Sequence, residues 1–187
     1  RIFVKAADRA GNSANAGIKH YIRRKAFKKD TIKISDKFLN WKKPEFSAEL
    51  SNDPQATPID KFLYINRDLR RINYQKIRKL TANSEEAFYW SGRFLRLPKS
   101  APRAGFGDHR TYTYNGRVID RQVHLGVDLA STEHSPVPAA NSGVVVFAEP
   151  LGIYGRTVFI DHGYGLFSMY SHLSRINVNI GQKLSKG

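Results

Sequence analysis

The sequence predicts a mainly β fold with a helical middle segment, α+β overall. From Trp90 onward, short runs of β-forming residues alternate with glycine turns such as Asn115-Gly116, the pattern of an all-β domain. Between residues 27 and 89, apolar residues recur at helical spacing. The chain has 187 residues, of which 41% are hydrophobic and 25% charged, so it can bury a sizeable core.

Composition excludes several protein classes. The chain has no cysteine, which rules out a disulfide scaffold, a thiolate zinc finger and a cysteine nucleophile. No apolar stretch approaches the about 20 residues that cross a bilayer. The chain opens on Arg1 without a signal peptide, so we expect a fragment or a processed product of a longer protein.

The charge is strongly asymmetric. The formal net charge is +15, from 31 Lys and Arg against 16 Asp and Glu. Residues 1–100 hold 23 of these cations and 10 of the acids, whereas residues 101–187 hold 8 and 6. A basic front half suits an anionic surface such as a bacterial envelope, or simply a solvated face. It has no nucleic-acid recognition motif, so we predict no nucleic-acid partner.

We divide the chain into three regions. Residues 1–26 hold two alternating runs around the turn-forming Asp8–Ser13, and we expect the terminal hairpin of an incomplete, immunoglobulin-like β-sandwich. Residues 27–89 are expected to form a helical, basic connecting segment, with an N-cap at Thr57-Pro58 and a shorter helix between Ser35 and Pro44. Residues 90–187 form the third region.

This third region is predicted to be all β. We expect strands at the following runs, separated by turns: 110–114, 143–147, 157–161, 166–170 and 176–180.

His124 and Asp128 are the first candidates for chemistry. They stand four residues apart, and the intervening Gly126 argues against a helix. A fully extended strand would separate their α-carbons by about 13 Å, too far for two ligands of one metal ion. A metal site therefore requires the chain to bend between them, and Gly126 permits that bend.

The other histidines are less informative alone. His172 follows Tyr170 near a predicted strand end, where it is either a hydrogen-bonded structural residue or a proton-transfer group near a metal. His162, in a glycine turn, is expected to be structural. We expect the remaining three, His20, His109 and His134, at the surface.

The order of several short motifs indicates a family. These motifs are, in chain order, Phe106–Arg110, His124–Asp128, Ser135–Ala140, Gly143–Val145, Tyr154–Val158, Asp161–Gly163, Tyr170–Ser174 and Gly181–Gly187. The series closely resembles the lysostaphin/LytM-type zinc metallopeptidases, bacterial endopeptidases that cut peptide cross-bridges of peptidoglycan. The resemblance covers residues 90–187, just over half of the chain.

The resemblance implies a fold and a site. The fold is a compact antiparallel β-sheet whose loop-walled groove holds the metal and an extended peptide. His124 and Asp128 occupy the positions of two ligands of a Zn²⁺ ion, one ion per complete catalytic domain. His172 occupies the position of a histidine that does not bind the metal but polarises water or stabilises the tetrahedral intermediate.

One element of the family pattern is missing. The family's third zinc ligand belongs to a His-x-His pair beyond a Gly-Gln-x-Leu segment, and no His-x-His occurs in this sequence. We therefore expect the peptidase domain to be incomplete at its C-terminus, with weak zinc binding and little activity in the 187-residue fragment, because a catalytic zinc needs three protein ligands plus water.

The resemblance implies a zinc endopeptidase acting on peptidoglycan stems or cross-bridges. The alternative is a non-catalytic adaptor of the same fold that binds the cell wall or activates a separate amidase. Joint retention of His124, Asp128 and His172 favours the enzyme. Peptidoglycan lies outside the cytoplasmic membrane, so the expected location is the bacterial envelope, periplasmic or extracellular, and the absence of cysteine suits an oxidising compartment.

Overall fold

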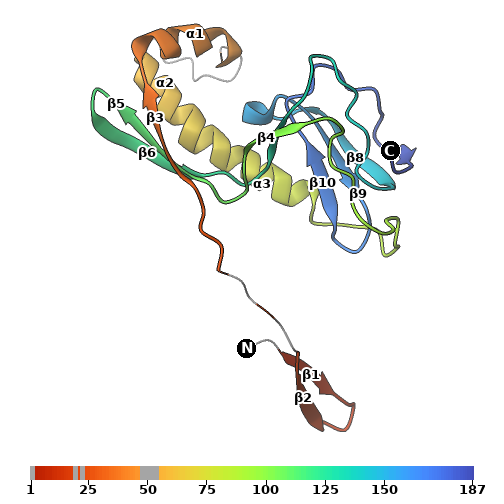
Figure 1. Ribbon diagram of the computed structural model, residues 1–187. Helices are drawn as coiled ribbons and strands as arrows, with labels where there is room; N and C mark the ends of the chain where they lie inside the picture. The colour runs from red at the N-terminus through yellow and green to blue at the C-terminus, as the bar shows by residue number, and fades with distance from the viewer. Residues whose placement is uncertain (1–2, 19–20, 22–23, 47–54) are drawn as a thin grey trace.

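The computed structural model describes residues 3–18, 21, 24–46 and 55–187. A small N-terminal hairpin lies apart from a larger body (Figure 1). The described strands are β1 (Phe3–Ala7), β2 (Ser13–Gly17), β3 (Lys29–Ile34), β4 (Ala101–Ala104), β5 (His109–Tyr114), β6 (Arg117–Val123), β7 (Asp128–Ala130), β8 (Gly143–Pro150), β9 (Arg156–Asp161), β10 (Phe167–Tyr170) and β11 (Lys183–Leu184). The described helices are α1 (Asp36–Phe46), α2 (Pro58–Tyr64), the π-helical η1 (Ile65–Leu69), α3 (Arg70–Leu80) and the short 3-10 helix η2 (Gly152–Tyr154). The predicted class, mainly β with a helical middle segment, is confirmed. Among these helices none is long and apolar enough to cross a bilayer.

The hairpin of β1 and β2 forms around the expected turn. The Asp8 carboxylate accepts hydrogen bonds from the N–H groups of Ala10 and Asn12, each at 2.9 Å. The side-chain and backbone hydrogen bonds from Asn12 lower the pKa of Asp8. Every residue of both strands is exposed, and an isolated two-stranded hairpin is marginal in water. Its identity as the end of a β-sandwich stays a prediction.

The strand β3 departs from the helical expectation for residues 27–89. It pairs parallel with β5, which pairs antiparallel with β6, so the sheet order is β3-β5-β6. Its residues alternate between exposed and more buried positions, and Ile32 and Ile34 face the core. This period-two spacing is a strand signal, but it covers only six residues beside longer helical patterns.

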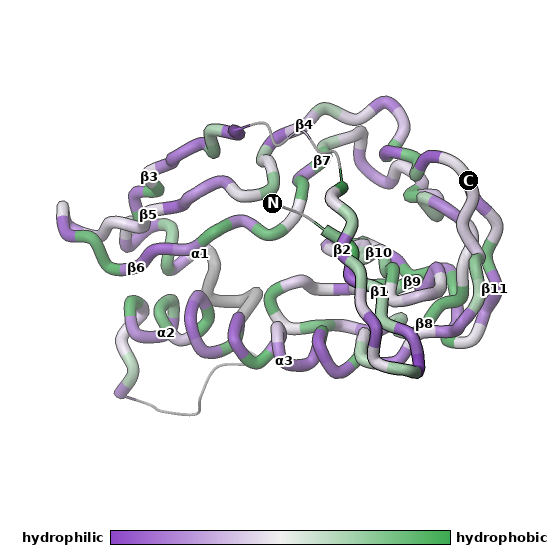
Figure 2. Tube along the Cα trace, turned by 90° about the horizontal axis from the view of Figure 1, so that it is seen from below, coloured by the Kyte–Doolittle hydropathy of each residue, from purple (hydrophilic) through white to green (hydrophobic). Residues whose placement is uncertain are grey.

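Helices α1 and α2 cover one face of this three-stranded sheet (Figure 2). The buried centre of their shared core is Ile34, Leu39 and Tyr112. Phe62 of α2 meets the Tyr112 ring edge-on at 5.6 Å. Helix α1 starts after Ser35, as expected, but continues through Pro44 to Phe46. A proline there removes one backbone hydrogen bond, and it does so in the last turn of the helix.

Three helical segments, α2, η1 and α3, run continuously from Pro58 to Leu80 and form the helical rod. The rod starts as the sequence predicts, with Thr57 as N-cap: its side chain accepts from the Asp60 N–H, and the Asp60 carboxylate accepts from the Thr57 N–H. The hydrogen bonds with Thr57 lower the pKa of Asp60, and the bond to the Thr57 side chain has the largest effect. Such a reciprocal capping box satisfies two N–H groups that a helix start otherwise leaves unpaired.

The π-helical turn η1 fastens the rod to β6. The backbone carbonyl of Asn66 accepts hydrogen bonds from Gln122 Nε2 at 3.0 Å and from Arg70 Nε at 3.2 Å. The Asn66 side chain donates to Asp120 Oδ2 at 2.6 Å, and Arg67 Nε donates to Asp120 Oδ1 at 3.1 Å. The wider turn of the π-helix thus exposes the Asn66 carbonyl, and Gln122 of β6 donates a hydrogen bond to it.

The C-terminal lobe is an antiparallel sheet of order β10-β9-β8-β11. Its first core is built on Val145, Val158 and Ile160. Its second core is built on Phe147, Leu151 and Phe159, and Ile77 and Leu80 of α3 pack against it. The helical rod therefore contributes to this core and also to the core beneath the β3-β5-β6 sheet. The domain boundary expected between residues 89 and 90 stays a prediction.

The strand predicted at residues 176–180 is wrong. This segment has no regular structure apart from a turn at Ile180. Ile176 and Val178 nevertheless pack against the Val145 core. Their alternation therefore reflects burial of every second side chain, which a strand and an irregular segment can share. The strand that pairs with the outer edge of β8 is β11, a few residues later.

Candidate metal centre

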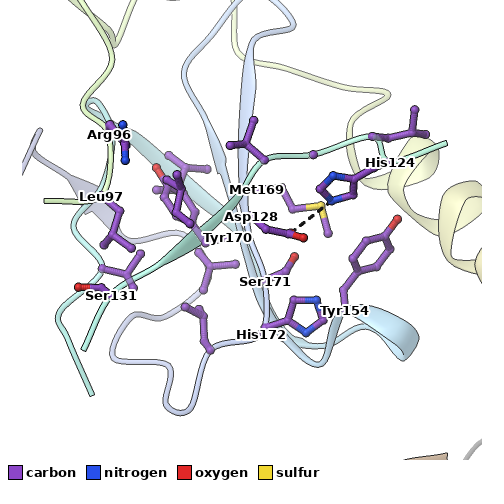
Figure 3. A pocket seen from close by; sticks show the side chains of 18 of the residues that line it. Arg96, Leu97, His124, Asp128, Ser131, Tyr154, Met169, Tyr170, Ser171 and His172 are labelled. Atoms are coloured by element: carbon purple, nitrogen blue, oxygen red, sulfur yellow. Dashed lines mark ion pairs between the residues drawn. The ribbon is translucent and has the colours of Figure 1, made fainter. Parts of the chain in front are cut away.

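His124 and Asp128 flank the bend between β6 and β7. The strand β6 ends at Val123, the backbone bends at Gly126, and β7 begins at Asp128. The bend brings His124 Nε2 within 3.2 Å of Asp128 Oδ1 (Figure 3). The structure therefore contains the bend that the sequence requires for these two residues to reach one ion.

The backbone of His124 is clamped by the loop that follows β4. The His124 N–H donates to the Asp108 carbonyl at 2.9 Å, and the Gly107 N–H donates to the His124 carbonyl at 2.7 Å. Gly107 has φ +84°, and a Cβ at this position would lie 2.2 Å from a carbon of the Phe27 ring. Only glycine fits such a position without displacing the ring.

The ring of His124 is oriented by a backbone carbonyl. Its Nδ1 lies 2.9 Å from the Gly105 oxygen. A carbonyl can only accept, so Nδ1 carries the proton and Nε2 faces Asp128. The imidazole is mostly buried, with 16% of its side chain exposed, whereas the Asp128 carboxylate is half exposed. Hydrogen bonds of this kind are typical of histidines that bind metals.

Asp128 is positioned by the pairing of β7 with β4. The register pairs Asp128 with Ala104, the residue before Gly105, so one strand pair sets both the carboxylate and the carbonyl that orients His124. The second oxygen of Asp128 accepts a hydrogen bond from Arg110 Nη2 at 3.4 Å. This long and half-exposed ion pair leaves the carboxylate available to a stronger cation.

The donor set suits a divalent cation. With Nδ1 protonated, a neutral His124 presents its Nε2 lone pair to a carboxylate oxygen 3.2 Å away. Two acceptors at this distance repel unless a proton or a metal ion lies between them. One imidazole nitrogen and one carboxylate oxygen are ordinary ligands of Zn²⁺. The residues therefore fit the metal that the family resemblance implies.

His172 lines the same cleft as His124 and Asp128, beside Tyr154 (Figure 3). We call this cavity the central cleft. The backbone of His172 has φ +58°, in the left-handed region, where histidine is several-fold enriched among non-glycine residues. Its N–H donates to the Tyr154 carbonyl at 2.9 Å, so η2 holds the residue in this conformation. Its role stays a prediction.

The remaining described histidines divide as expected. His162 is fully buried, with Nδ1 2.7 Å from the Ser142 carbonyl and Nε2 2.7 Å from Ser168 Oγ, so it is structural. His109 and His134 are exposed. His20 lies outside the described residues.

Within the described ranges, no group of three or more His, Asp or Glu side chains is arranged to hold a metal ion. The site there consists of two ligand candidates and His172. Sequence reasoning missed two residues that organise it, Gly105 and Arg110. Both lie within or next to the family motif Phe106–Arg110, but their roles depend on how β4 pairs with β7 and β5 with β6, and no local pattern encodes that pairing.

Comparisons with known proteins show that part of this chain is similar to a known family. The family model "Peptidase family M23" matches residues 122–187, which include His124, Asp128 and His172. The match confirms the resemblance to LytM-type peptidases that the motif series indicates.

Curated relatives agree with this match. The chain is 40% identical over 53 residues to "DD-carboxypeptidase/endopeptidase Mpg" of Neisseria meningitidis serogroup B, covering 28% of this chain and 12% of the relative. It is 41% identical over 84 residues to "Peptidoglycan DD-endopeptidase ShyA" of Vibrio cholerae, covering 45% and 19%. It is 35% identical over 79 residues to "Lipoprotein NlpD/LppB homolog" of Pseudomonas aeruginosa, covering 39% and 27%. The chain thus spans about a quarter or less of the length of these relatives.

Proposed function

We propose that this chain, whose residues 122–187 match the model of peptidase family M23, is part of a zinc-dependent endopeptidase that hydrolyses peptide cross-links of bacterial peptidoglycan. The observation that carries the proposal is the pairing of His124 Nε2 with Asp128 Oδ1 at 3.2 Å inside the central cleft. The names of two relatives support the substrate, since one is a peptidoglycan DD-endopeptidase and the other a DD-carboxypeptidase/endopeptidase.

His124 and Asp128 would hold the metal. The Gly105 carbonyl keeps the proton on Nδ1 of His124, which directs the free lone pair of Nε2 to the ion. Asp128 supplies a negative charge that offsets half of the charge of Zn²⁺. When bound, zinc polarises a substrate carbonyl and lowers the pKa of water toward about 7.

His172 would act on the scissile peptide without binding the metal. Its exposed side chain lines the cleft, where a protonated imidazole can donate to the oxygen that becomes negative as the peptide is attacked. It can then give its proton to the leaving nitrogen and regain one that the attacking water loses. General acid–base or oxyanion assistance of this kind contributes typically about 10²–10⁴-fold.

The proposed location is the bacterial envelope, periplasmic or extracellular. This follows from the proposed substrate, which lies outside the cytoplasmic membrane. The names of the relatives, two peptidoglycan enzymes and a lipoprotein, are compatible with it.

A second candidate is a non-catalytic adaptor of the same fold. It is favoured by one observation: the described residues offer two ligand side chains and no cluster of three. A catalytic zinc usually has three protein ligands. An adaptor would bind the wall or activate another enzyme through its surface, and neither task would depend on the charge of Asp128 or the imidazole of His172.

Two substitutions separate the candidates. Asp128→Ala should lose both zinc and hydrolysis, because the carboxylate supplies a ligand and a compensating charge. His172→Ala should retain zinc but lose about 10²-fold or more in hydrolysis. The exposed His134→Ala serves as the control. We would measure zinc content, release of peptides from purified peptidoglycan, and thermal melting.

Hydrolysis should be measured on the 187-residue chain and on a version extended by a His-x-His segment of the family. We expect little activity in the first and zinc-dependent activity in the second, because two ligands bind zinc weakly. If the extended Asp128→Ala and His172→Ala variants stay folded and digest peptidoglycan like their parent, these residues are not the active site.

A further inference from the structure

A row of exposed aromatic side chains lies beside the turn between β9 and β10. The ring centroids are 4.5 Å apart for Phe88 and Tyr164, 6.1 Å for Phe88 and Trp90, and 6.1 Å for Trp90 and Phe94. The exposed fractions are 73% for Phe88, 58% for Tyr164, 38% for Phe94 and 36% for Trp90. None of these four residues lines the central cleft. We call the four side chains the aromatic platform.

The backbone beneath the aromatic platform is fixed by hydrogen bonds between two segments that are far apart in sequence. The segment after α3 runs beside the β9–β10 turn (Figure 1). The Tyr164 N–H donates to the Glu85 carbonyl at 2.9 Å, and the Tyr89 N–H donates to the His162 carbonyl at 3.1 Å. The Glu85 N–H donates to the buried carboxylate of Asp161 at 2.9 Å. The rings therefore project from a firmly held backbone.

Tyr164 adopts a strained backbone conformation although its side chain is mostly exposed. Its φ is +48°, in the left-handed region that few non-glycine residues adopt. Strain of this kind is concentrated at functional sites. At the other end of the row, Phe94 meets the ring of fully buried His162 edge-on, with centroids 4.9 Å apart. The fold therefore anchors one end of the platform and leaves the other open to a ligand.

The size of the aromatic platform favours a small ligand group over a folded protein. At about 200 Å² for each aromatic side chain, the exposed fractions amount to roughly 400 Å². Patches of this size on a monomer are often functional. A stable protein–protein interface needs about 800 Å² from each partner. A second copy of this chain or another protein would need about twice the surface that the platform offers.

The charges beside the aromatic platform are balanced, unlike those of the chain as a whole. Residues 81–95 carry the exposed carboxylates of Glu85 and Glu86 and one guanidinium, that of Arg93. The ammonium of Lys186 reaches the same segment at the Ser91 carbonyl, 3.3 Å away. Anionic membranes and nucleic acids bind surfaces with a clear surplus of cations. The platform therefore suits an uncharged ligand.

A sugar ring is an uncharged ligand that stacks on aromatic rings. The face of an aromatic ring is negative, and the C–H groups on one face of a pyranose are polarised positive, so the two faces attract. Peptidoglycan, the proposed substrate, contains glycan strands as well as peptides. Phe94 directly precedes Leu95, which lines the central cleft. A glycan on the platform would therefore lie next to the cleft in which the attached peptide is cut.

We propose that the aromatic platform binds an uncharged sugar ring of a glycan strand, which stacks on Phe88 and Tyr164, the two most exposed rings of the row. The inference rests on the proposed function for the source of the glycan. Binding by these rings requires neither the metal nor hydrolysis.

The test is equilibrium binding without metal. A soluble chitin oligosaccharide, an uncharged glycan of N-acetylglucosamine, would be titrated into the 187-residue chain in the presence of a metal chelator. NMR would follow the backbone amides and the indole N–H of Trp90. We expect saturable shifts at Trp90 and Tyr164 and none at His124. The affinity should change little with added salt, because the contact does not depend on charge.

Variants assign the binding to the aromatic platform. Phe88→Leu keeps an apolar side chain but removes the aromatic face, so it should weaken binding about fivefold or more, and Tyr164→Ala should do the same. Phe88→Tyr restores the face and should bind like the parent. Phe3→Leu and Tyr21→Ala are the matched controls, because both residues are exposed aromatics outside the platform. Thermal melting checks that each variant is folded.

Several results would overturn the inference: no binding of the oligosaccharide, or unchanged affinity in folded Phe88→Leu or Tyr164→Ala. Dimerisation that is lost in Phe88→Leu would assign the aromatic platform to a second copy of the chain instead. Salt-sensitive binding to anionic lipid vesicles, lost in the same variants, would assign it to a membrane. Glycan binding without peptide hydrolysis in the extended chain would contradict the proposed function alone.

Discussion

At the scale of single residues, the site depends on how one imidazole is protonated. The Gly105 carbonyl accepts a hydrogen bond from Nδ1 of His124, so Nε2 faces the Asp128 carboxylate oxygen 3.2 Å away. Two facing acceptors are satisfied only when a proton or a metal ion lies between them. The pair would therefore favour a bound cation.

Asp128→Asn tests this electrostatic reasoning. The amide has nearly the shape of the carboxylate, but it can donate a hydrogen bond to the Nε2 lone pair of neutral His124. We expect the metal-free variant to melt within a few degrees of the parent and to lose zinc affinity about tenfold or more. Calorimetric titration with zinc and thermal melting measure both quantities. Undiminished zinc affinity would remove Asp128 from the ligand set.

A second prediction concerns two nearby glycines with positive φ, Gly163 at +93° and Gly165 at +77°. A Cβ on Gly163 would lie 1.6 Å from the Ala87 carbonyl oxygen, whereas a Cβ on Gly165 has nothing within 4 Å. Gly165→Ala should cost about 1–2 kcal/mol for the left-handed backbone. Gly163→Ala should cost about 1–3 kcal/mol more, because the backbone must move. Urea unfolding of both variants checks this, and equal destabilisation would contradict the contact.

At the scale of elements, the π-helical turn and β6 stabilise each other through Asp120. Burial alone would raise the pKa of Asp120, but hydrogen bonds from Gln122, Arg67 and Asn66 outweigh it and lower the pKa. A carboxylate whose folded pKa is below its unfolded value of about 3.9 stabilises the fold above that pH. This contribution is lost as the pH falls through the lower, folded pKa.

Asp120→Asn should therefore destabilise the chain at pH 7, and the difference from the parent should shrink as the pH falls below about 4 and vanish below the folded pKa of Asp120. The measurement is the melting temperature of both proteins between pH 7 and pH 2.5. A control is Asp68→Asn, whose carboxylate lies on the exposed side of the rod, 3.6 Å from Arg71. An Asp120→Asn deficit that persists unchanged into acid would show that the charge is not what holds the two elements together.

These elements also show where prediction from sequence ends. The start of α2 could be predicted because Thr57 and Asp60 form their capping box within four residues. The π-helical turn could not, because two of its partners on β6 lie more than fifty residues away: Gln122, which donates to the Asn66 carbonyl, and Asp120, which accepts from Arg67. The strand β3 could not be predicted for a similar reason: its parallel partner β5 lies far along the chain.

At the scale of the whole molecule, the helical rod connects two cores. Ile59 and Phe62 belong to the core beneath β3-β5-β6, and Ile77 and Leu80 to the core beneath β8 and β9. Side chains from the β3-β5-β6 sheet, from the C-terminal lobe and from the rod line the central cleft, which lies between these three parts. Its geometry therefore depends on the rod, far from His124 and Asp128 in sequence.

The candidate site was partly predictable for the same reason. The separation of His124 from Asp128 and the bend at Gly126 are local, so the sequence sufficed to foresee their approach. The Gly105 carbonyl and the Arg110 contact arise from strand pairing across about twenty residues.

Metal binding by His124 Nε2 together with Asp128 is tested most directly by a zinc titration of the 187-residue chain, followed through the imidazole ¹⁵N resonances of its histidines. We expect zinc to shift Nε2 of His124 while its Nδ1 stays protonated, to leave buried His162 unchanged, and to have no effect on His124 in Asp128→Ala. Zinc that shifts only other histidines, or shifts His124 equally in Asp128→Ala, would show that His124 and Asp128 do not bind the metal together.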